Sequence, residues 1–257
     1  MKDSITVVKV GTGVLTRTED GTLDGGALVR LVTALASVMD RGHRCILVSS
    51  GAVGSGVSSF QLDAYPQDIV TRQACAAVGQ ARLMQTYGAL FSNFHITVAQ
   101  VLLTAEDLAA RSIHISSTLR RLLDEPRIIP IINENDSVAI EELKVGDNDQ
   151  LSSRVAALIG AKRLILLTSA EGLLAPDSDL PIPEVKNIDE VFAFVRDTQG
   201  RFSIGGMASK LNAVKFSVES GIETWIANGR KPERIEDIVN GHGVGTKFLP
   251  TTNKSSV

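Results

Sequence analysis

The fold class is decided by the segment ITVVKVGTG, residues 5–13, near the start of the chain. Its β-branched residues predict a strand over Ile5–Val10, and the glycines that follow predict a sharp turn. Apolar residues from Leu28 to Met39 then recur at three- and four-residue spacing, which predicts a helix. The run Cys45–Val48 has the continuous apolar character of a strand buried on both faces. Strand, helix and strand in this order are typical of a parallel βαβ unit.

The same alternation continues through the rest of the chain. Further strands are predicted at Val98–Leu103, Ile128–Ile132, Leu164–Leu167, Thr224–Ala227 and Thr246–Leu249. Further helices are predicted at Gln67–Asn93, with a break near Gly79 or Gly88, and at Ala109–Leu123, Leu151–Ile159, Met207–Glu219 and Glu236–Asn240. A stretch rich in proline, aspartate and serine, Gly172–Glu184, predicts a loop or hairpin. We expect an α/β fold with a mostly parallel sheet and helices on both faces, as one domain over residues 1–250 with a polar tail at 251–257.

Composition and charge exclude several classes of protein. The chain has 257 residues, of which 44% are hydrophobic and 21% charged, so it is globular rather than disordered. Its 26 basic and 29 acidic residues give a formal net charge of −3, without the basic surplus typical of nucleic-acid binders. Because only 4% of the residues are aromatic, we expect a core of valine, isoleucine, leucine and alanine.

Neither a membrane protein nor a metalloprotein is indicated. No apolar run reaches the roughly 20 residues of a membrane span, and Met1–Val10 lacks the features of a signal peptide. Cys45 and Cys75 lie in apolar runs, which favours buried thiols, and the four histidines are scattered without ligand spacing. We expect a soluble protein of the cytoplasm.

The first candidate site follows the first predicted strand, because ligands of such sheets bind at the carboxyl ends of the strands. Strand alternation places Lys9 on the same face as Ile5 and Val7, where burial is costly unless an anion is near. Gly11 and Gly13 allow the backbone to approach such a ligand closely. The alternative is a lysine that reaches solvent at the strand end. No Walker A motif occurs in the chain, and the third glycine of a G-x-G-x-x-G motif is missing here.

Two further strand ends carry small or polar residues. Ser49–Gly56 combines hydroxyls with glycine amides, which suits a carboxylate or phosphate at a helix start, although a flexible turn has the same composition. Asn133–Ser137 and Lys144–Asp149 concentrate acids and amides after an apolar strand. They favour a polar pocket for a small zwitterion, in which acids hold an ammonium group and amides orient a carboxylate. The alternative is a solvated loop with Asx turns, in which Asn148 or Asp149 caps the next helix.

The last candidate site is the segment GGMASK, residues 205–210, which leads into a predicted helix. Lys210 is then expected in or near the first turn, where the helix dipole opposes a cation unless an anion binds at the same end. The alternative is an exposed lysine that tolerates this small penalty. Together, two lysines, two glycine loops and an acidic-amide loop at strand ends predict phosphoryl transfer without a P-loop.

Seven segments resemble, in order and spacing, the glutamate 5-kinase branch of the amino acid kinase superfamily. They are Val8–Thr12, Val48–Ala52, Ala76–Gln80, Ile132–Asp136, Lys144–Asp149, Gly205–Lys210 and Gly245–Phe248. Ile132–Asp136 and Lys144–Asp149 are more specific to that branch than the others. The resemblance covers almost the whole chain and implies the amino acid kinase fold, a three-layer αβα sandwich around a mostly parallel sheet. It also implies a short form, since the C-terminal RNA-binding-like domain of many members is absent after Phe248.

The resemblance implies ATP- and Mg²⁺-dependent phosphorylation of the side-chain carboxylate of L-glutamate, the first step of proline biosynthesis. By motif position, Lys9 and Lys210 would neutralise the transferring phosphoryl group, and Asp149 would hold both lysines in place. The residues implied for glutamate binding are Ser50, Gly51, Ala52, Asn133, Asp136, Asp147 and Asn148. Those implied for ATP binding are Lys9, Gly11, Thr12, Thr168, Ser169, Ile204, Gly205, Gly206, Met207, Ala208, Ser209 and Lys210. No protein ligand of Mg²⁺ is implied.

The resemblance further implies a homodimer or homotetramer, and feedback inhibition by proline. The chain departs from the family pattern on the nucleotide side, where Ser169 replaces the usual aspartate, Leu174 a tyrosine and Ile204 a threonine. Two alternatives stay open. One is a sister kinase acting on another small acid or on a nucleoside monophosphate, and the acid-amide loops count against it. The other is a non-catalytic nucleotide or amino-acid sensor, which the departures at Ser169 and Ile204 favour.

Overall fold

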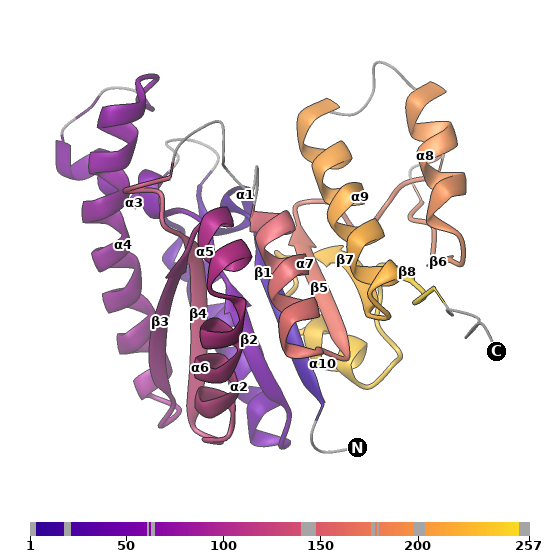
Figure 1. Cartoon of the computed structure of the whole chain (residues 1–257), viewed down its shortest axis with the longest axis horizontal. Helices are drawn as coiled ribbons and strands as arrows, with labels where there is room; N and C mark the ends of the chain where they lie inside the picture. The colour runs from indigo at the N-terminus through magenta and orange to yellow at the C-terminus, as the bar shows by residue number, and fades with distance from the viewer. Residues whose placement is uncertain are drawn as a thin grey trace.

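One sheet runs through the part of the chain that the computed structural model describes, namely residues 4–17, 22–60, 62, 65–139, 148–175, 178, 180–197 and 204–251, with the backbone alone at 193–197 and 204–206. Its strands are β1 (Ile5–Val10), β2 (Arg44–Val48), β3 (Thr97–Leu103), β4 (Ile128–Glu134), β5 (Arg163–Thr168), β6 (Glu184–Val185), β7 (Glu223–Asn228) and β8 (Thr246–Phe248). Their spatial order is β3-β4-β2-β1-β5-β7-β8-β6. Neighbours from β3 to β7 are parallel, β7 and β8 are antiparallel, and β8 and β6 are parallel. The predicted mostly parallel sheet is confirmed, with β1 between β2 and β5 (Figure 1).

Helices cover both faces of this sheet (Figure 1). One face carries α2 (Gly25–Asp40), α4 (Ile69–Ser92) and α10 (Arg234–Val239), and the other carries α6 (Ser112–Leu123), α7 (Asn148–Ile159), α8 (Ile188–Asp197) and α9 (Ile204–Glu219). The short helices α1 (Thr12–Leu15), α3 (Ala52–Val57) and α5 (Ala105–Ala110) follow the carboxyl ends of β1, β2 and β3, and a 3₁₀ turn, η1 (Ser58–Phe60), follows α3. This three-layer arrangement is the fold that the sequence predicts.

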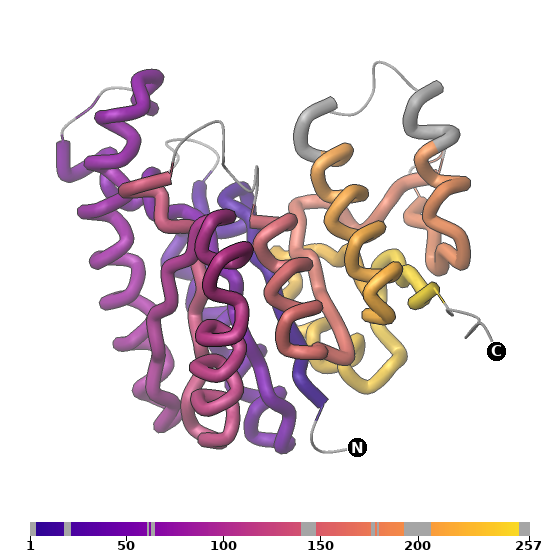
Figure 2. Tube along the Cα trace, viewed as in Figure 1, coloured from indigo at the N-terminus to yellow at the C-terminus, as the bar shows by residue number. Residues whose placement is uncertain are grey.

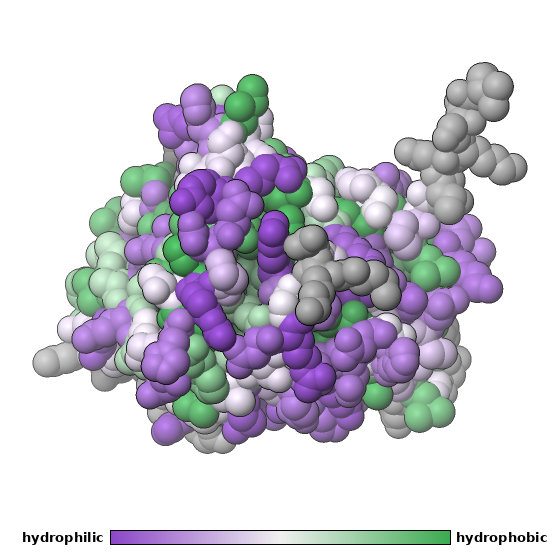
Figure 3. Space-filling model, turned by 90° about the horizontal axis from the view of Figure 1, so that it is seen from below, coloured by the Kyte–Doolittle hydropathy of each residue, from purple (hydrophilic) through white to green (hydrophobic). Residues whose placement is uncertain are grey.

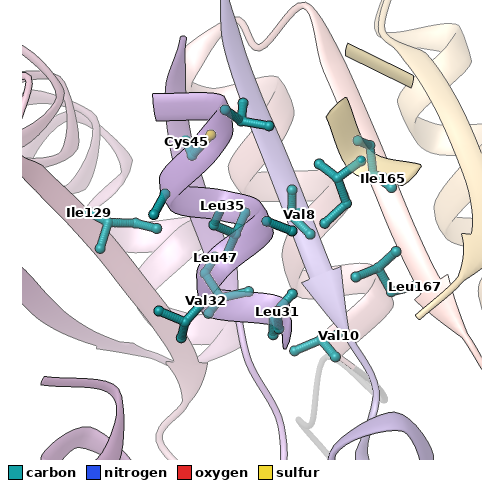
Figure 4. Packing of buried hydrophobic residues seen from close by; sticks show 14 of the residues in the cluster. Val8, Val10, Leu31, Val32, Leu35, Cys45, Leu47, Ile129, Ile165 and Leu167 are labelled. Atoms are coloured by element: carbon teal, nitrogen blue, oxygen red, sulfur yellow. The ribbon is translucent and has the colours of Figure 1, made fainter. Parts of the chain in front are cut away.

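Two apolar layers hold the helices against the sheet. In the layer beneath α2, branched aliphatic side chains such as Leu35, Leu47 and Ile165 pack together, fully buried (Figure 4). Val8 belongs to this layer, whereas its neighbour Val7 belongs to the layer on the opposite face of the sheet. Strand alternation therefore carries Lys9 to the face that α7 and α9 cover, as the sequence predicts.

The long helix predicted at Gln67–Asn93 is α4, and it is continuous, so the predicted break near Gly79 or Gly88 is wrong. The side chain of Asp68 accepts a hydrogen bond from the amide of Thr71 at 2.8 Å and so caps the start of α4. A Cβ atom on Gly79 would lie only 1.8 Å from the carbonyl oxygen of Ala52 in α3. Gly79 thus permits close helix packing and does not interrupt the helix.

Other differences from the predicted elements have local causes. The helix predicted at Ala109–Leu123 is divided into α5 and α6, because Thr104 and Asp107 form a capping box that starts a separate helix. The predicted hairpin over Gly172–Glu184 contains the antiparallel bridge between Leu174 and Pro181. The elements that follow it, β6 and α8, were not predicted. Strand β6 has only two residues, which are too few to show a period of two.

The edge of the sheet at which most strands begin is seen from below in Figure 3, where hydrophilic residues are interspersed with scattered hydrophobic ones. Cys45 and Cys75 are buried and not disulfide-bonded, as predicted. Over the described ranges, no helix has the length and apolar character needed to cross a membrane.

Candidate active site

A buried ionic bridge joins β1, α7 and α9 at the carboxyl edge of the sheet. Lys9 Nζ lies 2.8 Å from Asp149 Oδ1, and Lys210 Nζ lies 2.6 Å from Asp149 Oδ2. The carboxylate is fully buried and both lysines are nearly so. Helices α7 and α9 run side by side (Figure 2), and Gln150 Nε2 donates to the carbonyl oxygen of Ser209 at 3.1 Å. Lys9 therefore faces an anion, and the solvent-exposed alternative is wrong for both lysines.

The charges of this bridge do not cancel. Burial raises the pKa of the Asp149 carboxyl, but the ammonium groups of Lys9 and Lys210 lower it, and the result lies below the ordinary value. The carboxylate is thus ionised at neutral pH. Two ammonium groups around one carboxylate leave an excess positive charge where water is largely excluded, and such an excess attracts a phosphoryl group.

A cavity of about 230 Å³ lies next to the bridge, since Asn148, the neighbour of Asp149 in α7, lines it. Six of the residues predicted to bind glutamate line this cavity, namely Ser50, Gly51, Ala52, Asn133, Asp136 and Asn148. The seventh, Asp147, lies outside the described residues. The sequence-predicted polar pocket is therefore a cavity in the structure, with hydroxyl, amide and carboxylate groups around it.

Local backbone structure and hydrogen bonds shape this cavity. Gly51 adopts the left-handed conformation with φ of 96°, which glycine favours, and turns the chain from β2 into α3. Asn148 Nδ2 donates to the carbonyl oxygen of Ser49 and to Ser50 Oγ, each at 2.9 Å. Asn148 and Asp149 both lie inside α7, and Asp149 and Asn133 are buried. The alternative of a solvated loop with a helix cap is therefore wrong at these three positions.

The cavity also contains residues that the sequence analysis missed. The missed residues that line it are Tyr65, Arg72 and Gln73. Thr12, which was predicted to bind ATP, lines it too, as does Glu134 of the predicted polar segment Asn133–Ser137. The pKa of Tyr65 is raised, because burial and the nearby carboxylate of Asp136 outweigh the opposite effect of Arg72. Asp136 and Arg72 therefore both lie within electrostatic reach of Tyr65. Arg72 and Gln73 belong to the start of α4, which only the packing of α4 against α3 brings to this site.

The residues predicted to bind ATP lie at the ends of β1 and β5 and in α9. A Cβ atom on Gly11 would lie 3.4 Å from Lys9 Nζ, so the glycine leaves room beside the ammonium group. Thr168 ends β5, and Ser169 follows it. The predicted start of this helix at Met207 is wrong, because α9 already begins at Ile204 and contains Gly205 and Gly206 as well as Met207, Ala208 and Ser209. Lys210 consequently lies in the second turn of α9, and its ammonium group pairs with the carboxylate of Asp149. The sequence pattern predicts an anion bound at the start of the helix instead.

A second charged cluster joins the loops after β5 and β7, close in the chain to Thr168 and Ser169, which were predicted to bind ATP. The carboxylate of Glu171, in the loop after β5, accepts hydrogen bonds from Asn228 Nδ2 at 3.0 Å and Lys231 Nζ at 2.7 Å, and it pairs with Arg234. These bonds, that of Lys231 first, lower the pKa of Glu171 to about 2. The cluster ties the loop after β5 to the loop after β7.

Comparison with known proteins decides the family. The family model described as "Amino acid kinase family" matches residues 4–228. The chain belongs to the amino acid kinase family. A curated glutamate 5-kinase of Rippkaea orientalis is 44% identical, with 100% of this chain and 71% of the relative covered. Another, of Clostridium acetobutylicum, is 41% identical, with 95% of this chain and 94% of the relative covered. This amino acid kinase is thus homologous to glutamate 5-kinases over nearly its whole length.

Solved structures share the fold. Carbamate kinase from Giardia lamblia bound to AMP-PNP has a TM-score of 0.69 at 18% identity, with 97% of this chain and 99% of that chain covered. N-acetylglutamate synthase from Neisseria gonorrhoeae, complexed with coenzyme A and N-acetyl-glutamate, has a TM-score of 0.70 at 15% identity. That comparison covers 96% of this chain and 59% of the synthase. At these identities the likeness shows the amino acid kinase fold alone.

Proposed function

We propose that this amino acid kinase transfers the terminal phosphoryl group of ATP to the side-chain carboxylate of L-glutamate, giving γ-glutamyl phosphate and ADP in the first step of proline biosynthesis. The observation that carries the proposal is the adjacency of the Lys9–Asp149–Lys210 bridge and the polar cavity around Asn148. The homology to glutamate 5-kinases at 44% and 41% identity supports the choice of acceptor.

The chemistry needs positioning and charge rather than a base. A glutamate side chain has a pKa of about 4.3, so it is already a nucleophilic carboxylate at neutral pH. One carboxylate oxygen attacks the terminal phosphorus, the bond to the bridging oxygen of ADP breaks, and ADP leaves with that electron pair. The two reacting groups are both anions, and Lys9 and Lys210 offset their repulsion and the charge of the transition state. Asp149 holds the two ammonium groups beside one another.

The two substrates occupy neighbouring parts of the carboxyl edge. For the acceptor, Ser50, Asn148 and the amides near Gly51 and Ala52 suit a carboxylate, while Asp136 suits the ammonium group. Asn133 is buried in the wall of the cavity, and its Oδ1 accepts a hydrogen bond from Asn148 Nδ2, which orients the Asn148 side chain. For the nucleotide, the proposed contacts are Gly11, Thr168, Ser169 and the first turns of α9 up to Lys210.

Magnesium enters as part of the MgATP substrate in this proposal. Within the described residues, no group of three or more histidine, cysteine, aspartate or glutamate side chains is placed to hold a metal ion. The buried carboxylate of Asp149 is already shared by two lysines. We propose that phosphate oxygens of ATP and water are the main ligands of the ion.

Several further expectations stay predictions. They are a location in the cytoplasm, a homodimer or homotetramer, a single domain over residues 1–250, and inhibition by proline. For proline, the expected result is a lower rate or a weaker affinity for glutamate at saturating proline. An unchanged rate together with an unchanged KM for glutamate contradicts that expectation.

Trapping with hydroxylamine tests the proposed reaction. Hydroxylamine converts an acyl phosphate into a stable hydroxamate, so glutamate-dependent hydroxamate formed with MgATP identifies both the acceptor and the chemistry. N-acetylglutamate and a nucleoside monophosphate serve as competing acceptors in separate reactions. ATP consumption with one of these acceptors but not with glutamate contradicts the proposal and indicates a sister kinase. ATP binding without turnover on any acceptor indicates a sensor.

A further inference from the structure

Helix α4 reaches beneath the acceptor cavity with two buried polar side chains, Gln80 and Tyr87. Asn133 Nδ2 donates a hydrogen bond to Gln80 Oε1 at 2.9 Å. The hydroxyl of Tyr87 lies 2.9 Å from Ser49 Oγ, directly before Ser50 in the chain. Gln80 is 8% exposed and Tyr87 is fully buried, and neither lines the 230 Å³ cavity. These side chains therefore contact the wall of the site from outside it.

The backbone fixes the orientation of the two asparagine amides in this wall. The carbonyl oxygen of Ser49 can only accept, so Asn148 must face it with Nδ2. The amide N–H of Glu134 can only donate, at 2.9 Å, so Asn133 must face it with Oδ1. The same Oδ1 accepts from Asn148 Nδ2 at 3.0 Å.

With Asn133 held in this way, its Nδ2 group points towards α4. That group is buried, and a buried donor without an acceptor is costly. Gln80 Oε1 supplies the acceptor. The hydrogen bonds thus run in one direction, from Asn148 through Asn133 to Gln80.

We propose that Gln80 is a positioning residue for the acceptor substrate, acting through Asn133 on the orientation of Asn148. This inference rests on the proposed function, since Asn148 matters here as a contact of the acceptor. Loss of the oxygen of Gln80 leaves Asn133 Nδ2 buried without the acceptor it has here, and this favours movement of the Asn133 side chain. Such a movement weakens the contact between Asn133 Oδ1 and Asn148 Nδ2. The nucleotide side has no part in this chain of hydrogen bonds, so ATP binding is independent of it.

The test compares Gln80→Met, which removes the acceptor oxygen at similar length, with Gln80→Glu, which keeps one. The wild-type chain must first form glutamate hydroxamate, because its failure to do so refutes the proposed function and not this inference. For Gln80→Met we expect KM for glutamate to rise roughly 10-fold, with KM for ATP unchanged within about twofold. For Gln80→Glu we expect KM for glutamate to return to within about threefold of the wild-type value.

A control on the same helix separates positioning from packing. Thr86→Ala removes a hydroxyl that donates to the Arg82 carbonyl oxygen of α4 itself, and we expect both KM values to stay at wild-type level. Gln80→Leu replaces Gln80→Met should the latter not fold. The proposal is overturned if the apolar variant leaves KM for glutamate unchanged, if Gln80→Glu is as impaired as the apolar variant, or if both KM values rise together.

Discussion

Lys9 and Lys210, which lie 201 positions apart in the chain, place their ammonium groups beside the two oxygens of a single carboxylate, that of Asp149. The parallel sheet makes this meeting possible, because β1 lies centrally and α7 and α9 pack together on the face that Lys9 shares. The bridge is buried, so its excess positive charge is screened little by water. Three of the predictions below follow from such charged contacts.

Replacement of Lys210 by alanine should remove far more turnover than ATP affinity. Its charge matters most when negative charge develops in the transition state, so we expect kcat to fall roughly 100- to 1,000-fold while KM for ATP changes less than about threefold. Steady-state kinetics with varied ATP measures both values. Lys215→Ala, in the same helix but at an exposed ion pair, is the matched control and should keep normal turnover. Near-normal turnover of Lys210→Ala would overturn the assigned role.

Replacement of Asp149 by asparagine should destabilise the fold. It leaves two buried ammonium groups side by side without their counter-charge, and breaking a buried ion pair costs about 3–5 kcal/mol in the free energy of unfolding. Asp189→Asn breaks the exposed pair with Lys215 and should cost less than about 1 kcal/mol. Urea denaturation of both variants measures the difference. Equal stability of the two variants is the result that this account does not allow.

Glu171 should make the stability of the nucleotide-side loops dependent on pH. Its pKa in the folded state is about 2, below the ordinary value of 4.5, so the ionised carboxylate stabilises the fold. This contribution is complete above about pH 4.5 and is lost as the pH falls towards 2. The difference in unfolding free energy between wild type and Glu171→Gln should therefore shrink as the pH is lowered through that window. A difference that stays constant with pH contradicts the role of the carboxylate charge.

Two glycines of α4 should respond in opposite ways to alanine. At Gly79 the added Cβ atom meets the Ala52 carbonyl oxygen at 1.8 Å, so α3 and α4 must move apart, at a cost of roughly 1–3 kcal/mol. At Gly88 the space is open, and alanine should stabilise the helix by about 0.5–1 kcal/mol. Thermal or urea denaturation distinguishes the two. Because Ala52 lines the acceptor cavity, Gly79→Ala should also raise KM for glutamate, whereas Gly88→Ala should not.

Strands β1, β2, β4, β5 and β7 could be predicted because they are buried on both faces and therefore consist of nearly continuous apolar runs. The face of Lys9 followed from alternation with Val7 alone. The pairing of Lys9 with Asp149 did not follow from the strand pattern, because Asp149 is distant in the chain. Local rules describe Asp149 equally well as a helix cap. The resemblance to glutamate 5-kinases, rather than the residue pattern, brought the two together.

The errors on the nucleotide side and at α4 share one physical cause. Glycine has a low intrinsic helix propensity, so Gly205, Gly206 and Gly79 were interpreted as loop or break signals. In the structure, packing of α9 on α7 and of α4 on α3 outweighs that preference. Arg72 was missed for a related reason, since it belongs to α4 and the packing of α4 against α3 brings it to the acceptor cavity.

The central claim is that a glutamate side-chain carboxylate attacks the terminal phosphorus of ATP. It is tested most directly with L-glutamate that carries oxygen-18 in both oxygens of that carboxylate, incubated with MgATP and hydroxylamine. The attacking oxygen becomes the bridge between carbon and phosphorus, and hydroxylamine then attacks the carbonyl carbon and expels phosphate together with this oxygen. We predict released phosphate with one labelled oxygen and a hydroxamate that retains the other. Phosphate without the label would show that water is the nucleophile and would contradict the account.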